Sequence, residues 1–181
     1  MSNARNMSRF EDLLKECKRS NSKAMMELYN ICAMPVYNAS LHIVKNEFDA
    51  EEIMQDSILK AFDNIDRFLG TEKDFISLVK KIAVNKSIDW YRKHSKIPFF
   101  TEIENEVIGQ YDDDNDEPSF SIDLIKEKID LLPDGYRMVL YLHLIDELDF
   151  VDIAEILDIK PSSVRSQYVR AKEKLKRELG A

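Results

Sequence analysis

Apolar residues recur at helical spacing through the first half of the chain, and they predict four helices. The clearest period lies in residues 49–68, where apolar positions follow in steps of three and four: Ala50, Ile53, Met54, Ile58, Ala61, Phe62 and Ile65. Asp49 is expected to cap this helix, with Glu52 three residues on completing a capping box. The other predicted helices cover residues 8–19, 22–45 and 73–94. Together these four helices suit one bundle.

The apolar period stops in residues 97–121, which we interpret as a linker. This segment contains Pro98, Gly109 and Pro118, all typical of irregular structure. Between residues 101 and 117 lie eight acidic residues and no Lys or Arg. Like charges repel one another and keep such a segment extended.

The helical pattern resumes at Ile122. Pro133 ends a first helix, because proline disfavours helical backbone in the residue before it, and Asp134 is expected to cap the next. Two shorter helices follow at residues 149–157 and 161–179. Glycine and proline, four and five residues of 181, are too scarce for a sheet-rich fold with many turns. The sequence therefore predicts an all-α protein of two helical domains, 8–96 and 122–179, joined by the acidic linker 97–121.

The last two predicted helices have the plan of a helix-turn-helix, with a three-residue turn between them. Ala154 supplies the small residue needed where the helices approach, and Pro161 is favoured in the first turn of a helix. The polar side chains of the second helix that lie away from its apolar face are Ser162, Ser163, Arg165, Ser166, Arg170 and Lys172. Recognition helices use such N-terminal turns to reach base edges and phosphates. The alternative is an ordinary helical hairpin with a solvated basic face.

Charge is distributed unevenly along the chain. The net charge is −8, yet residues 78–96 hold six Lys/Arg and one acid, and residues 160–178 hold seven Lys/Arg and two acids. Local potential decides where phosphates bind. Two basic segments on an acidic chain are therefore compatible with nucleic-acid binding.

The end of the predicted helix 73–94 interleaves cations with aromatic rings. Residues 86–93 contain the only tryptophan, Trp90, beside Tyr91 and between basic residues. Rings beside cations suit unstacked single-stranded bases, and each stack contributes about 1–3 kcal/mol. The alternative is that Trp90 or Tyr91 simply packs in the core.

Four segments of the chain share residues and order with one known family. They run from Asp49 to Phe62, from Phe75 to Arg92, from Leu131 to Leu140 and from Asp152 to Leu175. The first two resemble region 2, and the last two region 4, of the extracytoplasmic-function sigma factors of RNA polymerase. The resemblance covers nearly the whole chain. Ser77-Leu78 departs from the family's Trp-Leu pair, and Asp158 stands where glycine is common in the turn. Both departures concern local packing rather than the predicted DNA faces.

The resemblance implies how the chain contacts polymerase and promoter. Core RNA polymerase would be bound through Glu52, Gln55 and Asp56, although a row of exposed acids is more often simply solvated. The −10 element, melted to a single strand, would be bound by Lys81, Asn85, Lys86, Asp89, Trp90, Arg92 and Lys93. The duplex −35 element would be bound by the six polar residues of the second helix of the helix-turn-helix. An anti-sigma factor, commonly membrane-linked in this family, is a further expected partner, and the cytoplasm is the expected location.

Signatures of an enzyme or a metal site are absent from the sequence. None of His42, His94 and His143 follows a glutamate by three residues, as helical di-iron sites require. H-E-x-x-H, P-loop and G-x-G-x-x-G motifs are missing as well. We therefore expect no catalysis, cofactor or metal. We expect Cys17 and Cys32 to be buried or half-buried free thiols in a reducing cytosol, with a disulfide or a metal pair as the alternative.

A regulator with a helix-turn-helix that acts without core polymerase remains the alternative function. Such a protein is expected to dimerise on paired half-sites, and the sequence contains no heptad seam for a dimer. No apolar run approaches the roughly 18–20 residues that cross a bilayer. The N-terminus also lacks a basic stretch followed by an apolar block, so we expect no secretory signal.

Overall fold

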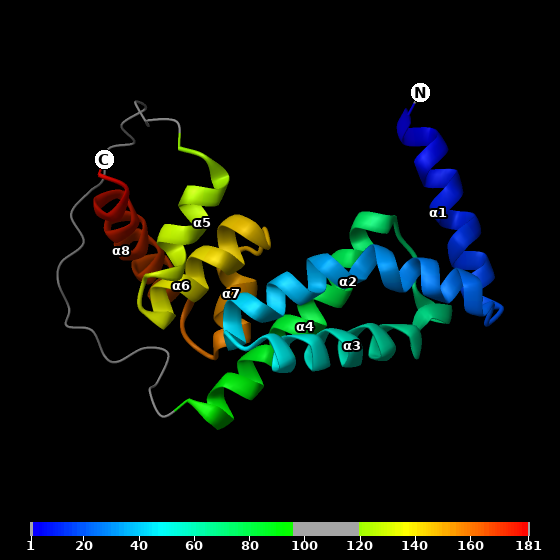
Figure 1. The fold of residues 1–181 in the computed structure, drawn as a ribbon, viewed down its shortest axis with the longest axis horizontal. Helices are drawn as coiled ribbons and strands as arrows, with labels where there is room; N and C mark the ends of the chain where they lie inside the picture. The colour runs from blue at the N-terminus through cyan, green and yellow to red at the C-terminus, as the bar shows by residue number, and fades with distance from the viewer. Residues whose placement is uncertain (1, 96–119, 181) are drawn as a thin grey trace. The chain divides into compact units, whose positions relative to one another are not determined.

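The computed structural model describes residues 2–95 and 120–180, and helices account for most of both stretches (Figure 1). Neither stretch contains a strand, which confirms the predicted all-α class. The chain divides into two compact units, the first of which ends at His94. The predicted linker 97–121 lies outside the described residues, except for Phe120 and Ser121.

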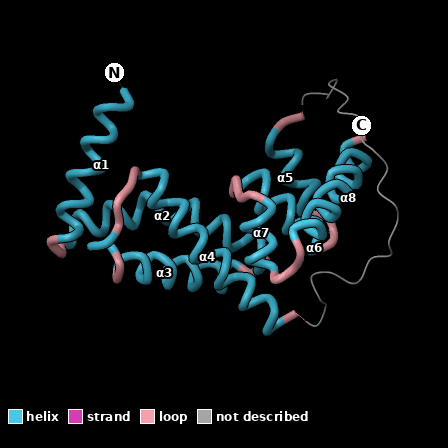
Figure 2. The backbone as a smooth tube through the Cα atoms, turned by 180° about the vertical axis from the view of Figure 1, so that it is seen from behind, coloured by secondary structure: helices cyan, strands magenta, loops and turns pink. Residues whose placement is uncertain are grey.

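The first unit is built around α2 (Ser22–Val44). Both α3 (Glu47–Phe62) and α4 (Glu72–His94) pack along α2, and α1 (Ser2–Lys18) crosses one of its ends. Figure 2 shows the same packing from behind. The core includes buried side chains from α2, α3 and α4: Leu28, Cys32, Val36, Ile43, Ile58, Phe75, Val79, Ala83 and Ile88. Each large apolar side chain buried here stabilises the fold by about 1.5–3 kcal/mol, so the outward faces of α3 and α4 are held on a rigid base.

The cap of α3 differs from the prediction. Asn46, in extended backbone, caps the helix by accepting a hydrogen bond from the Asp49 N–H at 3.1 Å. Asp49 therefore lies in the first turn, and the predicted capping box of Asp49 with Glu52 is wrong. The asparagine amide oxygen reaches the helix N–H groups one turn earlier than the sequence pattern indicated.

Two other boundaries in the first unit also differ. The predicted helix 49–68 is two elements, because α3 ends at Phe62 and a short 3-10 helix, η1 (Ile65–Arg67), follows. The first helix begins at Ser2 rather than at residue 8. Residues 2–7 contain no Gly or Pro that would stop a helix, so it extends past the apolar period.

The second unit comprises α5 (Ile122–Asp130), α6 (Asp134–Leu140), η2 (Tyr141–Ile145), α7 (Phe150–Leu157) and α8 (Pro161–Leu179). The long helix α8 packs against α5, α6 and α7. Part of the core is a cluster of buried residues from four elements and the turn after α5: Ile129, Leu132, Leu140, Tyr141, Ala171 and Leu175. Tyr141 donates a hydrogen bond to the Asp130 carboxylate at 3.1 Å, so this ring ties η2 to α5.

Asp134 does not cap α6 as predicted. It is the first residue of the helix, and its carboxylate accepts a hydrogen bond from the Arg137 guanidinium. Arg137 is only 5% exposed, and a buried cation requires such a partner. The Asp134 carboxylate therefore binds a side chain one turn along the helix rather than the first N–H groups of α6.

A five-residue π-helix, η2, continues directly from α6. Each hydrogen-bonded turn of a π-helix spans one residue more than that of an α-helix, which changes the direction in which the following side chains point. His143 lies at its centre, half-buried, with its Nδ1 2.8 Å from the Leu148 carbonyl oxygen. The sequence pattern did not predict this element.

The turn between α7 and α8 has the predicted position, residues 158–160. Asp149 caps α7 by accepting hydrogen bonds from the N–H groups of Val151 and Asp152 at 2.9 and 2.7 Å. Asp158 ends the helix in the left-handed region, with φ 55° and ψ 49°. The glycine that is common at this turn would adopt that backbone without a Cβ.

Candidate nucleic-acid interface

The helix-turn-helix presents the N-terminal turn of α8 to solvent. Ala154, Val164 and Ala171 are buried, as their apolar spacing predicted. The predicted −35 residues divide by exposure: Ser162, Ser163 and Arg165 are exposed, whereas Ser166, Arg170 and Lys172 are half-buried. Ser166 donates a hydrogen bond to the Ser162 carbonyl at 3.0 Å within the helix. The most exposed part of the predicted −35 surface is therefore the first turn and a half of α8, the part with which recognition helices contact base edges.

Arg165 extends over an aromatic ring of the preceding helix. Its guanidinium carbon lies 6.0 Å from the centre of the Phe150 ring. Phe150 is the first residue of α7 and was not among the residues predicted from the sequence. The sequence does show an aromatic residue at the start of α7. Its pairing with Arg165, however, depends on how the two helices cross, which the sequence pattern does not give.

The exposed face of α4 carries most of the predicted −10 residues. Lys81, Asn85 and Asp89 follow one another four apart, so the helix places them on one side, and all three are exposed. Arg92 and Lys93 are exposed as well, and Lys86 is half-buried. This face therefore combines cations, one amide and one carboxylate along a rigid helix.

The structure separates the two rings near the end of α4. Tyr91 is buried, with 7% of its surface exposed, and is a core residue. Trp90 is only half-buried and stacks on His94, with ring centroids 4.4 Å apart and an angle of 22° between the planes. Of the two rings, Trp90 is the one that a base can reach.

The predicted polymerase-binding residues lie on the outer face of α3. Glu52, Gln55 and Asp56 are all exposed. The Asp56 carboxylate pairs with the Lys86 ammonium of α4 at 3.0 Å. This ion pair joins the acidic face of α3 to the basic face of α4.

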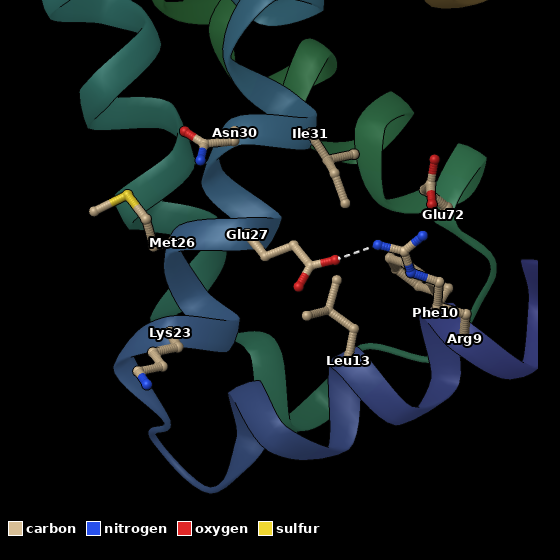
Figure 3. Close-up of a pocket in the computed structure, with 9 residues that line it drawn as sticks. All are labelled: Arg9, Phe10, Leu13, Lys23, Met26, Glu27, Asn30, Ile31 and Glu72. Carbon is tan, nitrogen blue, oxygen red and sulfur yellow. Dashed lines mark hydrogen bonds and ion pairs between the residues drawn. The ribbon is translucent and has the colours of Figure 1, made fainter.

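An open hollow of about 700 Å³ lies between α1 and α2. Figure 3 shows the Arg9 guanidinium reaching the Glu27 carboxylate beside it, at 2.8 Å. Among residues 2–95 and 120–180, no group of three or more His, Cys, Asp or Glu side chains could hold a metal ion. None of the helices in those stretches is long and apolar enough to cross a membrane.

Comparison with known proteins supplies the family. The family described as Sigma-70 region 2 matches residues 28–97, and Sigma-70, region 4 matches residues 122–175. The ECF RNA polymerase sigma factor SigW of Bacillus subtilis (strain 168) is 30% identical over 178 residues, 92% of this chain and 94% of that protein. SigM of the same organism is 28% identical over 156 residues, 83% of this chain and 91% of that protein.

A solved structure agrees at the level of the fold. The sigma factor RpoE of Bartonella quintana, crystallised with the anti-sigma factor NepR, has a TM-score of 0.54 and 16% sequence identity, covering 90% of this chain and 98% of that chain. The match therefore extends over both helical units of the present chain. The two family matches and the similarity to SigW show that this chain belongs to the extracytoplasmic-function family of RNA polymerase sigma factors.

Proposed function

We propose that this sigma factor brings core RNA polymerase to promoters and helps to open them, with its tasks divided along the chain. Residues 8–96 bind core polymerase and the −10 element, residues 122–179 bind the −35 element, and the acidic segment 97–121 connects them. The observation that carries this proposal is the C-terminal half of α4, which exposes Asn85 and leaves Trp90 only half-buried among neighbouring cations in the sequence. A protein that only reads duplex DNA does not need an accessible ring for unstacked bases.

On α8, the proposed contacts to the −35 element are of two kinds. Arg165 has the length and charge to reach a base edge in the major groove, where a good pair contributes about 1–3 kcal/mol to discrimination. Ser162 and Ser163, in the exposed first turn, suit phosphate oxygens, which position the helix without reading sequence. Ser166, Arg170 and Lys172 lie further along the helix and complete the proposed surface.

On α4, the proposed contacts to the −10 element are made to the bases and phosphates of the melted single strand. Trp90 offers a stacking face, and Asn85 offers an amide that hydrogen-bonds a base. Five further side chains of this helix complete the proposed surface: Lys81, Lys86, Asp89, Arg92 and Lys93. The cations favour the phosphates, whereas Asp89 is a hydrogen-bond acceptor only.

On α3, the proposed partner surface is Glu52, Gln55 and Asp56, which present carboxylates and an amide to a basic surface of core polymerase. We further propose that the protein acts in the cytoplasm, where its polymerase is, and that it catalyses no reaction of its own. An anti-sigma factor is a proposed regulator, since the similar RpoE was crystallised with one.

Run-off transcription from a genomic promoter library, with purified core polymerase and this chain, tests the proposal. Transcripts should start from a limited set of promoters that share −35 and −10 sequences, and the chain should co-purify with core polymerase. Glu52→Lys should weaken that co-purification, whereas Asp63→Lys, an exposed charge reversal just after α3, should not. Sequence-specific duplex binding without polymerase, and no transcription with it, would instead identify a regulator that acts alone.

A further inference from the structure

We infer that Phe150 is a specificity-determining positioning residue: its ring holds the Arg165 guanidinium in the direction required to read the −35 element. The inference rests on the proposed function, which assigns Arg165 to that element. It assigns to Phe150 a role in base selection without contact to the DNA.

The first argument is the geometry between the two helices of the motif. The Arg165 guanidinium lies 6.0 Å from the Phe150 ring centre, at the distance where a cation is attracted to the face of an aromatic ring. Arg165 is exposed, so without this ring its long side chain would sample many rotamers. A side chain that is ordered before binding loses less entropy when it meets a base.

The second argument is that the Phe150 ring is itself fixed. It lies 4.4 Å from the His143 ring and 5.3 Å from the Tyr168 ring, centre to centre. His143 also contacts Tyr168 edge-on at 4.8 Å. These three half-buried rings form one aromatic cluster, and such pairs prefer specific geometries.

The third argument is that the cluster is anchored to the core of the unit. Tyr168 packs against the buried cluster around Tyr141 and Ala171. His143 is oriented by the π-helix η2 and by its contact to the Leu148 carbonyl, 2.8 Å away. The Phe150 ring is thus packed between His143 of η2 and Tyr168 of α8, the helix that also carries Arg165.

The expected effect is confined to the base pair that Arg165 reads. An exposed cation above an aromatic ring contributes an amount equivalent to about a two- to fivefold change in an equilibrium constant. Phe150→Leu should therefore lower discrimination at that base pair by about two- to fivefold. Phe150→Tyr keeps the ring and should keep the discrimination. Val151→Ala, which truncates an exposed side chain at the next position of α7, serves as the matched control and should change nothing.

The test uses reconstituted holoenzyme and a promoter recovered from the library. Transcription is compared between this promoter and versions with each −35 base pair changed in turn. Arg165→Ala identifies the base pair concerned, and Phe150→Leu should then affect the same one. In the Arg165→Ala background, Phe150→Leu should have no additional effect, since the side chain that it positions is gone.

Four results would overturn the inference. An equal loss at every base pair, or an undiminished loss in the Arg165→Ala background, would show that Phe150 only supports the fold. Unchanged discrimination in Arg165→Ala itself would remove the assigned role of Arg165 and this inference with it. The fourth result does not depend on a stable variant: Cδ protons of wild-type Arg165 at random-coil chemical shifts would show that no ring lies over the side chain, whereas an upfield shift is expected.

Discussion

Burial controls the chemistry of the two cysteine thiols. Cys17 and Cys32 are both free and buried, as the sequence indicated. Burial, together with the nearby Glu72 carboxylate, raises the pKa of Cys32 to about 12. The pKa of Cys17 is also raised, first by burial and then by Glu27 and Glu16. Thiolates are the reactive form of cysteine, so neither thiol is suited to redox sensing in the folded protein.

The Cys32 thiol should be inert at neutral pH and should make the fold sensitive to alkali. Its folded pKa lies above its ordinary value of about 9. Its contribution to stability is therefore complete below pH 9 and is lost as the pH rises towards 12. With Cys17→Ala to isolate one thiol, a disulfide reagent at pH 8 should react slowly with folded protein and rapidly in guanidinium chloride. Equal rates in the two conditions would contradict the expectation.

Two buried serines provide a paired test of hydrogen bonding in the first unit. The Ser87 hydroxyl has no hydrogen-bond partner among the described residues, whereas the Ser57 hydroxyl donates to the Ile53 carbonyl at 2.6 Å. An unpaired buried hydroxyl is costly, so Ser87→Ala should raise the free energy of unfolding by about 0.5–1 kcal/mol. Ser57→Ala should leave it unchanged or lower it. Urea unfolding followed by circular dichroism measures both, and a less stable Ser87→Ala variant would refute the argument.

At the scale of elements, periodicity predicted the helices well and their caps poorly. The bounds of α8 match the prediction, and α4 differs by one residue, because long apolar stripes leave few alternatives. The Asn46 cap was missed because Asn46 and Asp49, both near that helix start, are both good caps. The π-helix η2 has no distinct sequence pattern. Its position depends on packing within the second unit.

The sequence predicted those parts of the candidate sites that depend only on the spacing of residues along one helix. The spacing of Lys81, Asn85 and Asp89 was sufficient to place them on one exposed face. Whether Trp90 or Tyr91 enters the core depended on the packing of α4 against α2, which spacing alone leaves open. The contact between Phe150 and Arg165 joins two helices across a turn, so it required the structure.

The backbone of Asp158, in the turn of the helix-turn-helix, is strained, and a substitution can remove this strain. Asp158 has φ 55°, which costs a residue with a Cβ about 1 kcal/mol. Glycine avoids that cost but loses more entropy on folding. Asp158→Gly should therefore stabilise the second unit by about 0.5 kcal/mol and raise its Tm by about 2–4 °C. Asp158→Val, which is β-branched, should lower the Tm, and the reverse order in a thermal melt would contradict this account.

At the scale of the whole molecule, two basic surfaces act within an acidic chain. Each compact unit contributes one of them, on α4 and on α8. The acidic remainder disfavours phosphate binding elsewhere. The division into units thus corresponds to the proposed division between melted and duplex DNA.

Asn85→Ala should separate promoter melting from promoter binding. Holoenzyme with this variant should still contain core polymerase and still protect the −35 region. It should lose permanganate-reactive thymines near the start site, because unpairing costs a few kcal/mol that bound bases must recover. A promoter already mismatched in that region should restore much of the transcription. Asn30→Ala, an exposed asparagine of α2, should behave as wild type.

If Asn85→Ala opens duplex promoters as well as the wild type, α4 is a plain phosphate-binding face. Trp90→Ala provides a second test of the same point. Its ring is half-buried against His94, so circular dichroism should accompany that variant to separate a loss of stacking from a loss of fold.

The ion pair between Asp56 and Lys86 has a consequence for genetics. One partner belongs to the proposed polymerase surface and the other to the proposed promoter surface, only 3.0 Å apart. A substitution of Asp56 also releases a lysine beside the DNA, so its phenotype combines two defects. Alleles of Asp56 should therefore show epistasis with alleles of Lys86, whereas alleles of Glu52, which lies one turn earlier on α3, should combine additively with them.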